Sequence, residues 1–195
     1  MRRVALLLVI LALTPACSRQ ELTLLAEGDL PQDVYGPPLP PPEPEEIPAN
    51  GTVYFISTRH LAPTSVRLQP VFDSQAEALL VSLFLPGPEG EDTFSEIPEG
   101  TRLNKVEVAG GIATVDVSGD FERAAPPRSQ ALRIAQVVFT LTEPGTGITS
   151  VRFQIDGVPQ EAIGGEQLGT IPGPVSREDY RRFAPGREQS RQARD

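Results

Sequence analysis

Residues 102–118 read RLNKVEVAGGIATVDVS and carry the clearest structural pattern in the chain. Apolar and polar residues alternate on both sides of Gly110-Gly111, as in strands that have one buried face and one wet face. A two-residue hairpin turn needs positive φ angles, which glycine adopts at little cost. The sequence therefore predicts a β-hairpin formed by residues 102–108 and 112–118. Three apolar residues share one face of its second strand: Ala113, Val115 and Val117.

The residues before this hairpin predict two strands and a helix. Residues 53–56 form an apolar run typical of a buried strand, and residues 66–69 alternate until Pro70, which ends that strand or leaves it at a sheet edge. Ser74 and Glu77 match a capping box, which marks the start of a helix. The apolar stripe of this helix has helical spacing and comprises Ala76, Leu79, Leu80, Leu83 and Phe84.

The residues after the hairpin predict a second helix and one more strand. Residues 129–141 have a helical apolar stripe with Ser129 as the expected N-cap, although residues 137–140 also have strand propensity. Residues 151–155 alternate and end at Asp156-Gly157. The order β-β-α-β-β-α-β predicts an α+β fold over residues 51–180. We expect a two-layer sandwich, in which a mostly antiparallel sheet of about five strands carries two helices on one face.

The composition excludes several classes of function. The chain has 195 residues, with 17 Lys and Arg against 26 Asp and Glu, and it contains one Cys, one His and no Trp. One Cys and one His cannot build a disulfide framework or a zinc site, so we expect no metal or other cofactor. A net charge of -9 argues against nucleic acid as a partner, because phosphate binding needs a basic surface.

Residues 1–16 are typical of a secretory signal peptide. Arg2 and Arg3 precede an apolar run over residues 4–13, which is too short to span a bilayer. Cys17 follows Ala16 directly, an arrangement that resembles the bacterial lipobox. We expect Cys17 to be lipidated and to hold the protein on the extracytoplasmic face of the cell membrane. The alternative is an ordinary signal peptide with a cysteine nearby by chance.

The two ends of the remaining chain predict no packed structure. Residues 17–50 form the lipidated N-terminus and a linker in which eight prolines fall between Pro31 and Pro48. Such a stretch favours extended polyproline II and acts as a spacer, although a proline-recognition groove is an alternative partner. Residues 181–195 are polar and arginine-rich, and we expect them to be a disordered tail.

No set of residues predicts catalysis. His60 is the only histidine and lies beside a predicted turn, and no serine lies in a nucleophile-elbow motif. Three carboxylates at strand ends or turns are candidates for an acid–base pair, but acids there are usually turn formers: Asp116, Asp120 and Asp156. Gly164-Gly165 lacks the pattern of a phosphate loop. The acidic loop lacks regular calcium-ligand spacing, and its acids include Glu89, Glu91 and Asp92.

The order of these elements resembles the GerMN domain, the sporulation and spore germination domain of bacterial lipoproteins. The resemblance covers residues 51–180 and has six parts in the same order. They are residues 53–56, the helix 77–80 ending near 85–88, residues 97–101, residues 111–118, residues 135–142 and residues 151–157. The resemblance implies a fold similar to the ring-building domains of secretion and basal-body proteins, and it brings no catalytic residues.

The resemblance implies an interaction or scaffold module of the cell envelope, in a sporulation, germination or envelope-signalling complex. We expect an envelope protein as the partner, with self-association as a further expectation. The edge strand near Val66 is one candidate pairing surface. Two alternatives stay open. One is a lipoprotein that binds a cell-wall polymer or small ligand, although three Tyr and no Trp disfavour sugar stacking. The other is a hydrolase, which would need buried acids in a cleft.

Overall fold

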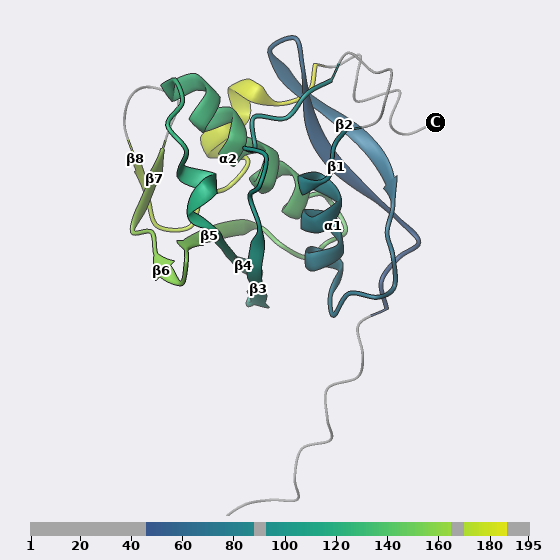
Figure 1. Ribbon diagram of the computed structural model, residues 1–195. Helices are drawn as coiled ribbons and strands as arrows, with labels where there is room; N and C mark the ends of the chain where they lie inside the picture. Colours follow the sequence, from purple (N-terminus) through teal and green to yellow (C-terminus); the bar gives the residue numbers. More distant parts are fainter. Residues whose placement is uncertain (1–45, 88–92, 165–169, 187–195) are drawn as a thin grey trace, which may run out of the picture. The chain divides into compact units, whose positions relative to one another are not determined.

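The computed structural model describes residues 46–87, 93–164 and 170–186, and Figure 1 shows their arrangement. Residue 17 and the acidic positions 89, 91 and 92 lie outside the described residues, as do residues 187–195. The elements in chain order are β1 (Asn50–Ser57), β2 (His60–Arg67), α1 (Gln75–Phe84), β3 (Leu103–Ala109), β4 (Ile112–Val117), η2 (Gly119–Glu122), α2 (Pro127–Leu141), β5 (Ser150–Ile155), β6 (Val158–Pro159), β7 (Ala162–Gly164), β8 (Thr170–Pro172) and η3 (Glu178–Phe183).

The predicted central hairpin is present as β3 and β4. Ala109 pairs with Ile112, and Gly110 and Gly111 make the turn with φ angles of 57° and 78°. The core face of β4 is fully buried at Ala113, Val115 and Val117. The alternation in the sequence therefore identified both the turn and the buried face.

The α+β class and the two helices are confirmed, whereas the grouping of the strands differs from the expectation. The described strands form three sheets, with the orders β1-β2, β3-β4-β5-β6 and β7-β8. β4 and β5 are parallel, because α2 connects them as a crossover. The β1–β2 hairpin is a separate sheet, so the expectation of one mostly antiparallel sheet of about five strands is corrected.

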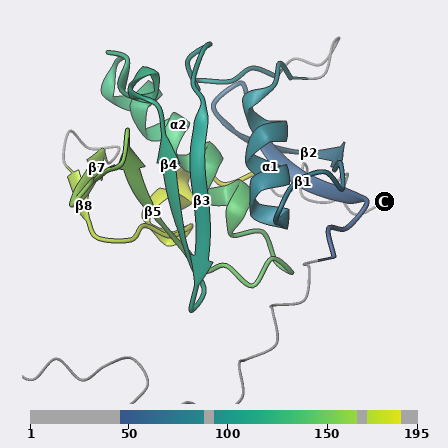
Figure 2. The same cartoon turned by 60° about the horizontal axis from the view of Figure 1, so that its bottom comes forward.

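Only α2 lies against the inner face of the four-stranded sheet, whereas α1 lies beside β3 at the sheet edge, so the expectation of two helices on one face is corrected; both helices also reach the β1–β2 hairpin. Each helix contacts β1, while α1 also contacts β3 and α2 also contacts β5. Figure 2 shows the sheet strands beside α1, with α2 behind them. One continuous cluster of buried apolar side chains joins these elements.

Two predicted boundaries shift for local reasons. β2 begins at His60, well before the expected strand at residue 66, and its first buried residues are Leu61 and Ala62. Pro63 interrupts the alternation there, which hid the start of the strand. In α2 the N-cap is Pro126 and not Ser129. Pro127 is the first residue of the helix, where proline is suitable because the amide hydrogen that it lacks would have no helical partner.

The domain extends past the expected boundary at residue 180. η3 continues to Phe183, and the side chains of Tyr180 and Phe183 are fully buried. The predicted disordered tail was therefore assigned three residues too early within the part of the chain that the structure describes. An aromatic anchor in a polar segment has no periodic neighbours, so the pattern did not reveal it.

The capping box of α1 is formed as predicted. The Ser74 hydroxyl oxygen accepts a hydrogen bond from the Glu77 amide at 3.1 Å, and the Glu77 carboxylate accepts one from the Asp73 amide at 3.0 Å. We expect Ser74→Ala to lower the free energy of unfolding by about 1 kcal/mol, because the amide then loses its cap. Urea denaturation measures this loss. Ser74→Asp retains an acceptor and should stay near the wild type, and an equal loss in both variants would contradict the prediction.

Candidate interaction surface

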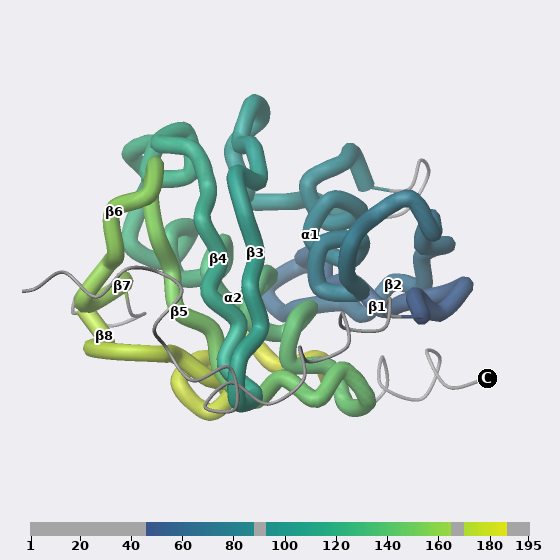
Figure 3. The backbone as a smooth tube through the Cα atoms, turned by 90° about the horizontal axis from the view of Figure 1, so that it is seen from below, coloured from purple at the N-terminus to yellow at the C-terminus, as the bar shows by residue number. Residues whose placement is uncertain are grey.

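Within the part of the chain that the structure describes, no helix covers the outer face of the four-stranded sheet. Figure 3 shows β3, β4 and β5 side by side in front of α2. The pairing register places polar side chains in two rows across this face. One row is Lys105, Asp116 and Gln154, and the other is Glu107, Thr114 and Arg152. Positive and negative groups are interspersed in both directions, which suits recognition by complementary charges.

The hypothesis of strand pairing near Val66 finds little support at the edge of β2. The Tyr54 amide donates to the Thr140 hydroxyl at 3.0 Å, and the Tyr54 carbonyl accepts from the Gln136 amide at 3.1 Å. Both backbone groups of Tyr54 thus point away from β2, so the Tyr54–Pro63 pair is not hydrogen-bonded. The backbone of Pro63 faces the outer edge and offers no amide hydrogen there. A proline in this place opposes addition of a further strand.

The two edges of the β3–β4–β5 part of the sheet are occupied. α1 lies beside β3 on the side away from β4 (Figures 2 and 3). β5 pairs with β6 near its end, and Val151 of β5 exchanges two backbone hydrogen bonds of 2.8 Å with Val175. Because these contacts occupy the edges, the candidate docking surface is the outer face of the sheet.

The candidate carboxylates serve the backbone. Asp116 accepts from the Gly157 amide and Asp156 accepts from the Gly119 amide, both at 3.0 Å. The Asn104 amide group lies 3.5 Å from both carboxylates and links them. The structure thus brings together two of the three predicted acids, at an exposed sheet end and not in a buried cleft. Their hydrogen bonds hold turns, which is the role that acids at such positions usually have.

The remaining sequence candidates are scattered. Asp120 instead forms an ion pair with Arg123 at 3.1 Å. His60 is exposed at the turn between β1 and β2. Gly164 ends β7, and the residue after it lies outside the described residues. Within the described part of the chain, no three metal-ligating side chains are close enough to hold an ion, and no helix is both long and apolar enough to cross a bilayer.

Two buried polar residues of α2, Arg133 and Gln136, organise the loops behind the sheet. Gln136 is fully buried, and its side-chain oxygen accepts from the Glu96 amide at 2.9 Å. Arg133 is 5% exposed and donates to the carbonyls of Glu96, at 2.9 Å, and of Phe121. Burial lowers the pKa of the Arg133 guanidinium, which still carries its charge at neutral pH. Sequence reasoning missed this role, because both residues lie outside the predicted apolar stripe of the helix, where polar side chains are expected to face solvent.

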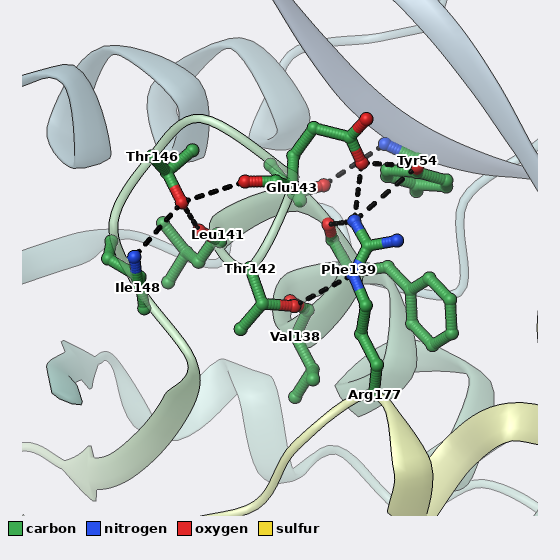
Figure 4. Close-up of polar contacts among 10 residues, drawn as sticks. Tyr54, Val138, Phe139, Leu141, Thr142, Glu143, Thr146, Ile148 and Arg177 are labelled. Carbon is green, nitrogen blue, oxygen red and sulfur yellow. Dashed lines mark hydrogen bonds and ion pairs between the residues drawn. The ribbon is translucent and has the colours of Figure 1, made fainter. Parts of the chain in front are cut away.

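A second polar cluster joins β1, the end of α2 and the segment before η3 (Figure 4). The Arg177 guanidinium donates to the Glu143 carboxylate, to the Phe139 carbonyl at 2.7 Å and to the Thr142 hydroxyl at 3.0 Å. The Tyr54 hydroxyl donates to the same carboxylate. Burial, with the Glu143 hydrogen bond, raises the pKa of Tyr54 to about 12. Sequence reasoning missed this cluster, because its members are far apart along the chain.

A small cleft lies between α2 and the β7–β8 hairpin. Its volume is about 250 Å³, which is smaller than the range of about 300–1,000 Å³ typical of ligand pockets. Apolar side chains form much of its wall, among them Ile134, Ile155 and Ile163. This geometry favours a binding face over an enclosed ligand site.

Comparison with known proteins agrees with this fold. The family model Germane, described as "Sporulation and spore germination", matches residues 52–161. The tandem GerMN domains of the sporulation protein GerM from Bacillus subtilis superpose with a TM-score of 0.51 at 23% identity, covering 67% of this chain and 46% of that one. The chain thus spans about half the length of that tandem structure. The first of those GerMN domains alone gives a TM-score of 0.49 at 24% identity, over 66% of this chain and 98% of that one. A candidate lipoprotein from Clostridium perfringens gives 0.46 at 17% identity, over 67% and 88%. No curated protein matches the chain.

The raised pKa of Tyr54 predicts a loss of stability at high pH. The unfolded tyrosine ionises near pH 10 and the folded one near 12, so the unfolded state holds fewer protons between these values. The free energy of unfolding should therefore fall as the pH rises from 10, by up to about 1.4 kcal/mol per pH unit. Tyr54→Phe should have a shallower slope in urea denaturation. Tyr180, whose pKa burial also raises, is present in both chains and sets the baseline. If the free energy of unfolding fell equally with pH in the wild type and in Tyr54→Phe, the raised pKa of Tyr54 would be contradicted.

Proposed function

Since the chain belongs to the Germane family of sporulation and spore germination proteins, we propose that it is a lipid-anchored interaction module of the bacterial cell envelope. Its task is to hold a protein partner near the extracytoplasmic face of the membrane, within a sporulation, germination or envelope-signalling complex. The observation that carries this proposal is the outer face of β3, β4 and β5, which no described helix covers and whose edges are occupied by α1 and by Val175.

The chemistry of this face fits a protein partner. Lys105 and Glu107 lie on β3 and form an ion pair at 2.8 Å, Asp116 lies on β4 and Arg152 lies on β5. The face therefore carries no net charge, although the whole chain carries -9. Interspersed charges on a rigid sheet select a partner by their pattern and disfavour partners with a different one. The proposed role requires no reaction, and the family description names none.

Binding of a small ligand or cell-wall polymer is the second candidate. The cleft beside β7 is the observation that favours it. Stacking on a sugar polymer needs exposed aromatic rings; among the described residues Phe94 is 47% exposed, whereas Tyr54 and Tyr180 are 4% and 0% exposed. Neither tyrosine ring offers a free face for a sugar to stack on. We therefore place this candidate behind the protein-binding role.

The anchor is tested at Cys17. We expect Cys17→Ala to move the protein from the membrane fraction, or to leave an unprocessed precursor, because the acylated thiol is then absent. Metabolic labelling with a radioactive fatty acid, followed by a denaturing gel, measures acylation of the wild type. The label should be lost in Cys17→Ala. An unlabelled wild type that is secreted in soluble form would contradict the anchor.

The docking face is tested by charge reversal. We expect Lys105→Glu/Arg152→Glu to reduce recovery of the envelope partner at least tenfold in a pull-down from solubilised membranes. Arg59→Glu/Arg67→Glu is the matched control, because it makes the same change in net charge on the β1–β2 hairpin. Both chains should keep the wild-type circular dichroism spectrum. Equal recovery by the two variants would show that the outer face is not the docking surface, while retention on peptidoglycan alone would favour the second candidate.

A further inference from the structure

The C-terminal segment, defined here as residues 174–183, binds across the rest of the domain. It follows β8 through Pro172-Gly173-Pro174 and lies beyond residue 161, where the family match ends. Its first anchor is Val175, which is fully buried and pairs with Val151 at the edge of β5. The segment thus adds a short antiparallel bridge to the sheet, as a bound peptide does in strand addition.

The second anchor is Arg177. Its guanidinium carbon lies 4.7 Å from the centre of the Phe139 ring and 5.2 Å from that of the Tyr54 ring (Figure 4). Two aromatic rings, the Glu143 carboxylate and the Phe139 carbonyl therefore form a recess that recognises a guanidinium by shape and by charge. Every group of this recess comes from β1 or from α2 and the residue pair after it.

The third and fourth anchors are aromatic. Tyr180 and Phe183 are both fully buried, and the Tyr180 hydroxyl donates to the Gly164 carbonyl at 3.0 Å. The segment also has order of its own, because the Asp179 carboxylate accepts from the Ser176 amide at 2.7 Å. A short segment with an internal turn and four anchors, all of them bound to the rest of the domain, has the properties of a peptide ligand in a groove.

We propose that the C-terminal segment is a detachable ligand, and that its groove also accepts the same segment from a second copy of this chain. The groove, defined by Tyr54, Phe139, Thr142, Glu143 and Val151, fits the segment of any identical chain equally well. Exchange between two copies preserves every anchor contact and closes a symmetric dimer. Gly173, with a φ of 73°, lies at the joint where the segment would swing out.

The balance between the two forms depends on concentration. In a single chain the segment is held near its own groove, so the local concentration favours the closed monomer. A high density of copies favours exchange. The contacts that hold the segment do not involve Cys17, so exchange does not depend on a lipid at that residue.

Disulfide trapping between two different chains tests the proposal. Both chains carry Cys17→Ala, so that only introduced thiols react. The acceptor chain carries Val151→Cys and the donor chain carries Val175→Cys together with an affinity tag. These positions face each other across a hydrogen-bonded pair, where the Cα atoms are about 5.5 Å apart and within reach of a disulfide. After oxidation of the mixed full chains, we expect at least ten times more linked heterodimer than with an acceptor carrying Val158→Cys, which is an exposed control position.

Two further variants distinguish specific docking from random collision, because they should change the heterodimer yield in opposite directions. Arg177→Ala in the donor should reduce the heterodimer severalfold, because the donor segment loses its anchor. The same change in the acceptor should increase it severalfold, because the acceptor's own segment then leaves the groove more often. If circular dichroism shows that Arg177→Ala does not fold, Arg177→Lys should give smaller shifts in the same two directions. A heterodimer yield equal to the control, or the same response to both variants, would overturn the proposal.

Discussion

A helix that is buried all round leaves its polar side chains no access to water, and α2 is such a helix. Residues 131–141 are buried without a break, so each polar group among them needs a partner inside the protein. Gln136 and Thr140 satisfy theirs on the backbone of β1, and Arg133 does so on the loop at Glu96 and on η2. The surrounding elements are therefore held to α2 by directional hydrogen bonds as well as by apolar contacts. The same helix also connects β4 to β5 as a crossover, which is the connection that a parallel pair of strands needs.

The parts of the fold that sequence could predict are those with local signals. The β3–β4 hairpin has its turn residues between two alternating runs, and α1 has a capping box directly before its apolar stripe. The pairing of β4 with β5 depends on contacts between distant segments, which no local pattern records. Val175, Tyr180 and Phe183 escaped notice because each is an isolated apolar residue in a polar stretch. Burial of such residues is decided by the groove they meet and not by their neighbours in sequence.

The candidate surface was predictable only in part. Alternation placed Thr114, Asp116 and Arg152 on the wet face of their strands, but the rows across three strands appear only with the pairing register. Asp116 and Asp156 were candidates for chemistry, and the structure shows instead that they hold backbone amides at a sheet end. The positions of these residues in the structure thus replace a weak catalytic hypothesis with a structural role. The structure also reveals a candidate binding surface that no short sequence motif indicates.

The proline at the outer edge of β2 has a consequence for how copies of this protein can assemble. Proteins confined to a surface meet one another far more often than proteins in free solution, and exposed strand edges would then seed open-ended β-aggregates. Pro63 removes an amide hydrogen at the outer edge of β2, α1 lies against β3, and Val175 pairs with β5. Growth of a continuous intermolecular sheet is blocked at these edges as long as the C-terminal segment, from the same chain or from a second copy, occupies the edge of β5. Crowding of this domain should therefore yield assemblies of finite size and not fibres.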